Sequence, residues 1–182
     1  IKSATIYRSG ASNNTIDGAD SLSVIGIASA GFIQGLVGND TIHIAGNVNK
    51  TTLKGGSDQD LITVVGSISS SAVFGNKGAD TIAIDATSTN AEFANTTVYG
   101  ANANITLTGN DSIFVSAISA VNSTIFGDAG NDSITFNSTA STRTQQGLII
   151  EANAGDDSVV FSGVLSESTI FFPEAAAGRA GH

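Results

Sequence analysis

The chain has 182 residues, of which 41% are hydrophobic and 6% aromatic; it contains no Cys, Met or Trp and carries a formal net charge of -9 at pH 7. This length suits one domain with a core, and the lack of cysteine excludes disulfides and thiolate metal sites. The acidic charge argues against nucleic acid or an anionic membrane as the main partner and favours cations.

No segment is long and apolar enough to cross a bilayer, so we expect no membrane insertion. The first residue, Ile1, is not followed by the basic region of a signal peptide, and a start without Met suggests a piece of a longer protein. Glycine and β-branched residues occur throughout, and no helical period persists beyond a few residues. The composition therefore predicts an all-β fold.

One short motif recurs seven times along the chain. In order, the copies read "IDGADSLSV", "GLVGNDTIHI", "GGSDQDLITV", "GNKGADTIAI", "TLTGNDSIFV", "GDAGNDSITF" and "ANAGDDSVVF". Their shared aspartates are Asp20, Asp40, Asp60, Asp80, Asp111, Asp132 and Asp157. Because the first four are 20 residues apart, the chain is expected to stack similar units on one another.

Each copy predicts a strand, a glycine-rich turn and a second strand. Apolar residues stand two and four positions after each aspartate, as in Ile42 and Ile44, which indicates a strand with one buried face. A further apolar residue stands seven positions before most of them, as in Ile33 and Leu53. The remaining residues of each unit form a looser return, such as "AGNVNKTT".

The repeat favours a parallel β-solenoid of the β-roll type over residues 1–172, with about seven coils of about 20 residues and two short strands in each coil. Residues 173–182 are expected to form a tail or linker, since the sole proline, Pro173, ends the array. The segments "DATSTNAEFANTT", "ANANITLTG" and "NSTASTRTQQG" are longer than their counterparts and predict loops. An antiparallel β-sandwich is the alternative, but it gives no reason to repeat Asp and Gly at one edge.

Stacked coils would align the seven aspartates along one edge. Neighbouring carboxylates one strand spacing apart repel by roughly 3–4 kcal/mol at an effective dielectric constant near 20. Glycine-rich turns next to them would free backbone carbonyls, and Ca²⁺ takes six to eight such oxygen ligands. A column of calcium ions would therefore relieve the repulsion. In the alternative, each Asp accepts hydrogen bonds from backbone N–H groups of its own turn.

The motif resembles the nonapeptide G-G-x-G-x-D-x-U-x of RTX (repeats-in-toxin) proteins, whose parallel β-roll binds Ca²⁺ between stacked turns. The resemblance implies metal ligation by Asp20, Asp40, Asp60, Asp80, Asp111, Asp132 and Asp157, completed by carbonyls of the turns. The opposite edge lacks acids, so at most one column is expected. Thr15, Thr106 and Ala152 replace the first glycine in three units, which makes the pairs Asp40–Asp60, Asp60–Asp80 and Asp111–Asp132 the better candidates.

No residue cluster is unique enough to predict an active site, and His43 should face outward between two inward isoleucines. The expected function is a non-catalytic, calcium-binding structural repeat domain of a secreted or cell-surface bacterial protein of the RTX, adhesin or surface-layer type. Surface polysaccharide, or other copies or domains of the parent protein, are its candidate partners. The alternatives are a metal-independent spacer of a virion or appendage, and a glycan-binding module that uses Phe74, Tyr99 and Phe126.

Overall fold

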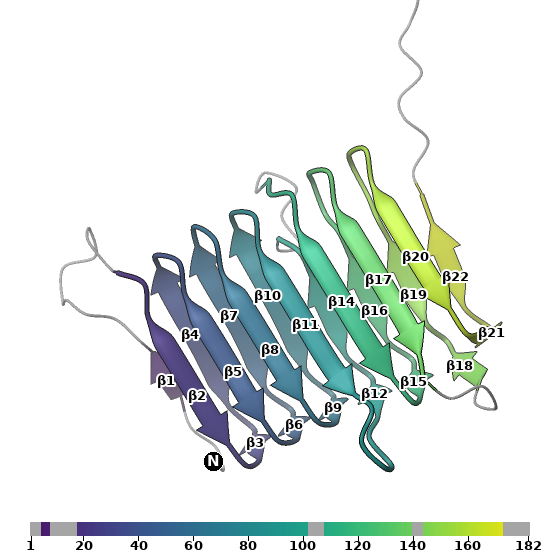
Figure 1. The fold of residues 1–182 in the computed structure, drawn as a ribbon, viewed down its shortest axis with the longest axis horizontal. Coiled ribbons are helices and arrows are strands. Elements are labelled where there is room, and N and C mark those ends of the chain that lie inside the picture. Colours follow the sequence, from purple (N-terminus) through teal and green to yellow (C-terminus); the bar gives the residue numbers. More distant parts are fainter. Residues whose placement is uncertain (1–4, 8–17, 102–107, 140–143, 173–182) are drawn as a thin grey trace, which may run out of the picture.

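In the computed structural model, the chain winds into a three-sided parallel β-solenoid (Figure 1). The structure describes residues 5–7, 18–101, 108–139 and 144–172. Every strand pairing in these ranges is parallel, which confirms the solenoid and excludes the β-sandwich. None of the described residues forms a helix long and apolar enough to cross a membrane.

Three sheets, each named here after its first strand, form the sides of the solenoid. The β1 sheet contains β1 (Thr5–Tyr7), β4 (Phe32–Val37), β7 (Thr52–Ser57), β10 (Ala72–Lys77), β13 (Thr97–Tyr99), β16 (Thr124–Phe126), β19 (Ile149–Glu151) and β22 (Thr169–Phe171). The β2 sheet contains β2 (Ser21–Ile25), β5 (Thr41–Ala45), β8 (Leu61–Val65), β11 (Thr81–Ala86), β14 (Ser112–Ala117), β17 (Ser133–Ser138) and β20 (Ser158–Ser162). It faces the viewer in Figure 1.

The third side was not predicted. The β3 sheet consists of β3 (Ala28–Ser29), β6 (Val48–Asn49), β9 (Ile68–Ser69), β12 (Phe93–Ala94), β15 (Ala120–Val121), β18 (Thr144–Gln146) and β21 (Val164–Ser166). The sequence had suggested two strands per coil and a loose return, whereas each coil has three. A strand of two or three residues places only one side chain inward, as Val48 does, so it is too short to show an alternating pattern.

Inward-facing side chains of the three sheets form one continuous core. The residues two and four positions after each aspartate are buried in the inner coils, as predicted, and stack on one another in register, such as Ile42 on Ile62 and Ile44 on Val64. The β1 sheet adds Leu53 and its equivalents. Because parallel strands of successive coils lie directly over one another, like residues form columns along the whole solenoid.

One irregular segment lies at a corner of the solenoid. Residues 87–92 form a longer connection between β11 and β12. The other two predicted loops include residues 102–107 and 140–143, and the predicted tail covers 173–182, and these three stretches lie outside the described residues. The second of these loops was predicted over residues 137–147, but its ends overlap β17 and β18. The insertions leave the stacking intact, because β11 still pairs with β14 and β17 with β20.

Candidate functional site

The seven aspartates form a single column at one corner of the solenoid. Each of them directly precedes a strand of the β2 sheet, at the turns that form the upper rim in Figure 1. Strands of that sheet pair in register, so that Thr41 opposes Leu61 and Leu61 opposes Thr81. The sequence therefore predicted this alignment correctly, and the fold brings all seven residues together.

The carboxyl groups point into the solenoid. Asp40, Asp60, Asp80, Asp111 and Asp132 are each only 2–4% exposed, whereas Asp20 and Asp157, in the end coils, are half-buried. The sequence analysis had not distinguished an inward from an outward column. Inward carboxyl groups must be satisfied by the protein itself, because water does not reach them.

Among the described residues, Oδ1 of six of the seven aspartates accepts a hydrogen bond from the backbone of the neighbouring coil. The N–H of each aspartate donates to Oδ1 of the next one along the column, at 2.7–2.8 Å, for the acceptors Asp40, Asp60, Asp80, Asp111, Asp132 and Asp157. The expected alternative placed such bonds within one turn, but they link successive coils instead. The side chain thus takes the place of a sheet carbonyl at the corner where the regular ladder is interrupted.

The second oxygen, Oδ2, differs from Oδ1 in four of the coils. Within the described part of the chain, Oδ2 of Asp60, Asp80, Asp111 and Asp132 is buried without a hydrogen bond. A glycine lies beside each of them, because a Cβ at Gly75, Gly100 or Gly127 would collide with Oδ2 of Asp80, Asp111 or Asp132, respectively. The same Cβ would meet the backbone carbonyl oxygen of Gly100, Gly127 or Ala152 in the next coil. In these three coils, two acceptor oxygens therefore lie close to the same glycine.

This contact explains the glycine five residues before the aspartate and corrects one expectation. In the Asp111 coil the sequence placed Thr106 at that position, but Gly100 lies against the Asp111 carboxyl group. The six residues 102–107 separate the glycine from its motif in sequence without separating them in space. The Asp111 carboxyl group consequently has a glycine against it, as the carboxyl groups of Asp80 and Asp132 do.

Burial raises the pKa values of these carboxyl groups. Loss of hydration raises the pKa of Asp60 to about 8, although the hydrogen bond from the Asp40 backbone opposes it and the charges of Asp80, Asp40 and Asp58 add to it. The same burial raises the pKa of Asp111 to about 7 and that of Asp80 and Asp132 to about 6. Desolvation favours the neutral form of an acid, so at pH 7 Asp60 is mostly neutral and Asp111 is about half neutral, whereas Asp80 and Asp132 become mostly neutral only below about pH 6.

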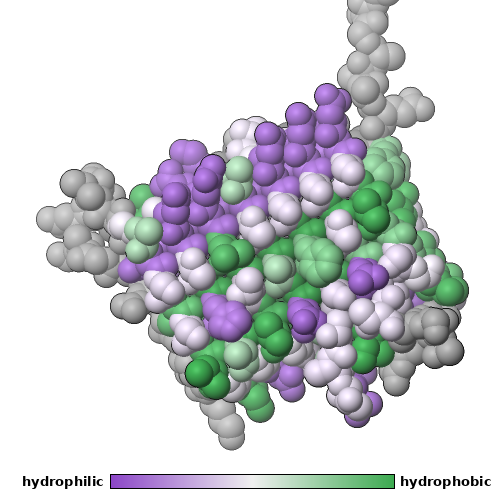
Figure 2. Space-filling view, in the orientation of Figure 1, coloured by the Kyte–Doolittle hydropathy of each residue, from purple (hydrophilic) through white to green (hydrophobic). Residues whose placement is uncertain are grey.

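The outer rim of the same corner is polar and exposed. Figure 2 shows hydrophilic side chains gathered above the turns, where Asp58 and Asp156 are exposed. Asn39, Asn110 and Asn131 each accept a backbone N–H from the next coil at 2.8–3.0 Å. Asp128, which stands in the motif "GDAGNDSITF", is buried, and its pKa is raised to about 6 by desolvation.

A second column, of hydroxyl groups, was missed by the sequence analysis. At the corner between the β3 and β1 sheets, side-chain oxygens accept a backbone N–H from the preceding coil at 3.0–3.4 Å and donate to a carbonyl two residues earlier; they belong to Thr51, Ser71, Ser123 and Ser168. The signal was a hydroxyl eleven residues after Asp40 and Asp60. Serine and threonine are so frequent here that the pattern did not stand out.

Calcium is poorly matched by this arrangement. The atoms nearest to a Cβ at Gly75, Gly100 or Gly127 include one Oδ2 and one carbonyl oxygen, whereas Ca²⁺ takes six to eight oxygens. In the Asp111 coil, for example, Oδ1 is already an acceptor for the Asp80 backbone N–H, and Oδ2 is buried. Among the described residues, no group of three or more His, Cys, Asp or Glu could hold a metal ion. Calcium ligation by the column stays a prediction.

Comparisons with protein-family models, curated proteins and solved structures find no match to this chain. The resemblance to RTX repeats therefore stays at the level of the motif. What the protein does has to be inferred from its geometry.

Replacing Gly75 by alanine is expected to destabilise the fold by roughly 1–3 kcal/mol, the usual cost of overpacking a core. The new Cβ would overlap the backbone carbonyl oxygen of Gly100 and the Asp80 carboxyl group. The carboxyl group is held in place by the hydrogen bond that it accepts from the Asp60 N–H. Urea denaturation of Gly75→Ala measures the change. Gly18→Ala is the matched control, because nothing lies within 4 Å of a Cβ at Gly18; equal losses for both variants would contradict the packing role.

Proposed function

We propose that this domain is a non-catalytic structural module, a stiff β-solenoid that holds its coils together without a metal ion and serves as a segment of a secreted or cell-surface bacterial protein. The observation that carries the proposal is the buried ladder in which each Asp Oδ1 accepts the backbone N–H of the neighbouring aspartate. The aspartates recur in every coil, as residues with a structural role do in a repeat protein, whereas an active site is normally unique. A virion or appendage is the alternative setting for the same spacer role.

The stack supports this role because its bonds are repetitive and internal. Each coil contributes to three parallel sheets, one carboxyl ladder and one hydroxyl ladder, all of which run along the solenoid axis. In such arrays, stability is close to a sum over neighbouring coils. A structure of this kind transmits force and spaces its two ends at a fixed distance.

Calcium binding is the second candidate. It is favoured by the unpartnered Oδ2 atoms of Asp80, Asp111 and Asp132, each of which shares a small space with a backbone carbonyl oxygen. A cation or a proton would satisfy such a pair of oxygens. A proton agrees with the raised pKa values of these groups, and below about pH 6 most of them would carry one.

Calcium dependence can be tested by thermal unfolding of the protein at pH 7.5. Circular dichroism would be recorded with about 5 mM EDTA and with about 5 mM CaCl₂, a concentration above the dissociation constants of weak extracellular calcium sites. For the metal-independent module we expect the same spectrum and melting temperature in both, because binding to the folded state alone would raise the melting temperature. A clear rise with Ca²⁺, absent with Mg²⁺, would establish the calcium-binding function instead.

A further inference from the structure

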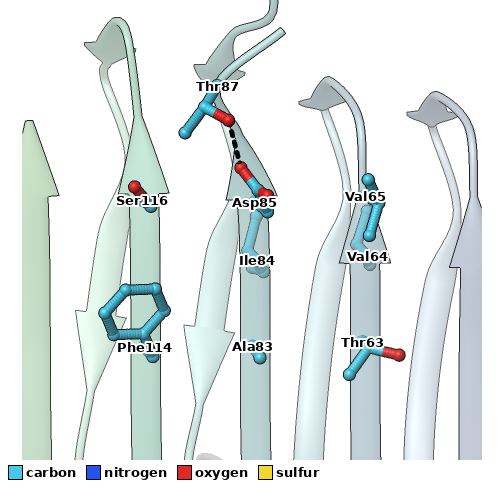
Figure 3. A pocket seen from close by; sticks show the side chains of 9 residues that line it. All are labelled: Thr63, Val64, Val65, Ala83, Ile84, Asp85, Thr87, Phe114 and Ser116. Carbon is cyan, nitrogen blue, oxygen red and sulfur yellow. Dashed lines mark hydrogen bonds between the residues drawn. The ribbon is translucent and has the colours of Figure 1, made fainter. Parts of the chain in front are cut away.

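A hollow of about 360 Å³ lies on the outer face of the β2 sheet, away from the aspartate column (Figure 3). Ala83 is opposite Thr63 on one side and Phe114 on the other, so its small side chain forms the floor between two larger neighbours. Val65, Asp85, Thr87 and Ser116 also line the hollow, which we call the Ala83 hollow. Its volume is at the small end of the range for ligand sites.

Phe114 presents an aromatic surface beside this hollow. Its side chain is 43% exposed, Figure 3 shows the ring broadside to the viewer above the sheet, and no ring contact is found for it among the described residues. The aromatic residues of the β1 sheet differ in this respect. Phe74 and Tyr99 stack with ring centroids 4.8 Å apart, and Tyr99 and Phe126 stack at 5.0 Å. Their faces cover one another, so the site expected there has little free aromatic face to offer.

Polar groups surround the aromatic surface. The Asp85 carboxylate is exposed and accepts a 2.5 Å hydrogen bond from Thr87 Oγ1, which fixes its position at the edge of the hollow (Figure 3). A second hollow of about 310 Å³ shares Val65, Asp85 and Thr87 and adds Asn47 and Ser88 to the lining. Asp85 therefore stands between two adjoining hollows, one with an aromatic wall and one with amide and hydroxyl groups.

This combination matches a sugar ring. A pyranose has a face of polarised C–H groups, which suits the negative face of an aromatic ring, and a rim of hydroxyls, which a carboxylate can accept in pairs. Apart from Asp85, the polar groups of both hollows are uncharged hydroxyls and an amide, which favours a hydroxyl-rich ligand over an alkylammonium group. The net charge of -9 disfavours acidic sugars.

We propose that the Ala83 hollow and its neighbour bind a short stretch of a neutral or amino-sugar polysaccharide, with one sugar against Phe114 and its hydroxyls on Asp85. Binding here adds a ligand-recognition role to the structural one and does not depend on the aspartate column. Two adjoining hollows would accommodate two or three consecutive sugar units. The shallow shape predicts weak binding by a single domain.

Saturation-transfer difference NMR on the intact 182-residue chain tests this proposal with cellotriose, maltotriose and N-acetylated chitotriose as probes, and with trigalacturonic acid as the acidic control. We expect binding of at least one of the first three probes and none of the fourth. Phe114→Ala and Asp85→Asn should each weaken that binding by about tenfold or more. Phe126→Ala is the matched control, since it removes an aromatic ring from the β1 sheet. The affinity of this variant for the probe should be unchanged.

The substituted side chains lie on the outer surface, and circular dichroism verifies that each variant is folded. Ala83→Trp, which fills the hollow, provides a second test and should abolish binding. Three results would overturn the proposal. The first is no signal from any neutral probe at about 10 mM, a concentration at which a site of millimolar Kd would be occupied. The others are a loss of probe binding in Phe126→Ala equal to that in Phe114→Ala, and binding of tetramethylammonium in place of the sugars.

Discussion

The melting temperature of this protein is expected to fall as the pH rises from about 4 to about 9. The pKa values of Asp80, Asp132 and Asp128 are raised to about 6, that of Asp111 to about 7 and that of Asp60 to about 8, all mainly by desolvation. The ordinary value of 3.8 applies to the unfolded chain. Below pH 3.8 these groups are neutral in both states and impose no penalty.

The sign of the effect follows from proton binding. Between pH 3.8 and the folded pKa values, the folded state binds more protons than the unfolded one, so stability declines with pH. Above about pH 8 the full penalty is present. One group raised by two units costs roughly 3 kcal/mol, but the groups interact, so their separate penalties do not add. The charges that act on the column come from other aspartates, including Asp58 and Asp128.

Thermal unfolding with EDTA present, at several pH values in that range, measures the trend. Most soluble proteins with salt-bridged carboxylates become less stable in acid, so the opposite slope would be specific to this column. A melting temperature that is independent of pH, or that rises with pH, would contradict neutral buried acids.

The second large effect is expected at Asp111, where alanine and asparagine should behave in opposite ways. Asp111→Ala removes the acceptor of the Asp80 N–H and leaves a buried donor unsatisfied, which costs roughly 1–3 kcal/mol before the loss of packing is counted. Asp111→Asn retains Oδ1 and places an N–H₂ group where Oδ2 faces the Gly127 carbonyl oxygen. We therefore expect it to stabilise the protein above pH 7 and to weaken the pH dependence.

Urea denaturation at pH 6 and pH 8 distinguishes the two variants. Asn110→Ala is the matched control, because Asn110 makes the same kind of bond, to the Asn131 N–H, on the exposed rim, and its loss should cost under about 1 kcal/mol. If Asp111→Asn destabilises the protein as much as Asp111→Ala does, and only when Ca²⁺ is present, the column is a cation site and not a neutral ladder.

Much of the fold could be predicted because every repeat unit has the same pattern of apolar, acidic and glycine residues. The period of 20 residues indicated the length of one coil. The alternation of apolar residues at Ile42 and Ile44 indicated which face of the strand points to the core. The alignment of the aspartates then followed, since equal spacing places equal residues over one another. Such patterns can be recognised in the sequence because every coil packs against its neighbours in the same way.

The role of the aspartates was decided only by the tertiary structure. Sequence alone shows that acids recur next to glycines, but a carboxyl group that faces inward and one that faces a solvent channel have the same spacing. The close approach of Gly100 to Asp111 crosses a six-residue insertion, so no local motif contains it. The Ala83 hollow likewise depends on three neighbouring strands, where a small residue happens to lie between Thr63 and Phe114.

The sequence by itself thus determined the winding, the core columns and the line of acids, because these depend on spacing along the chain. The third sheet, the inward direction of the carboxyl groups, their raised pKa values and the surface hollow depend on which coils and side chains meet across the chain. Those contacts arise only once the coils are stacked, since burial and hydrogen bonding between coils are properties of neighbours in space.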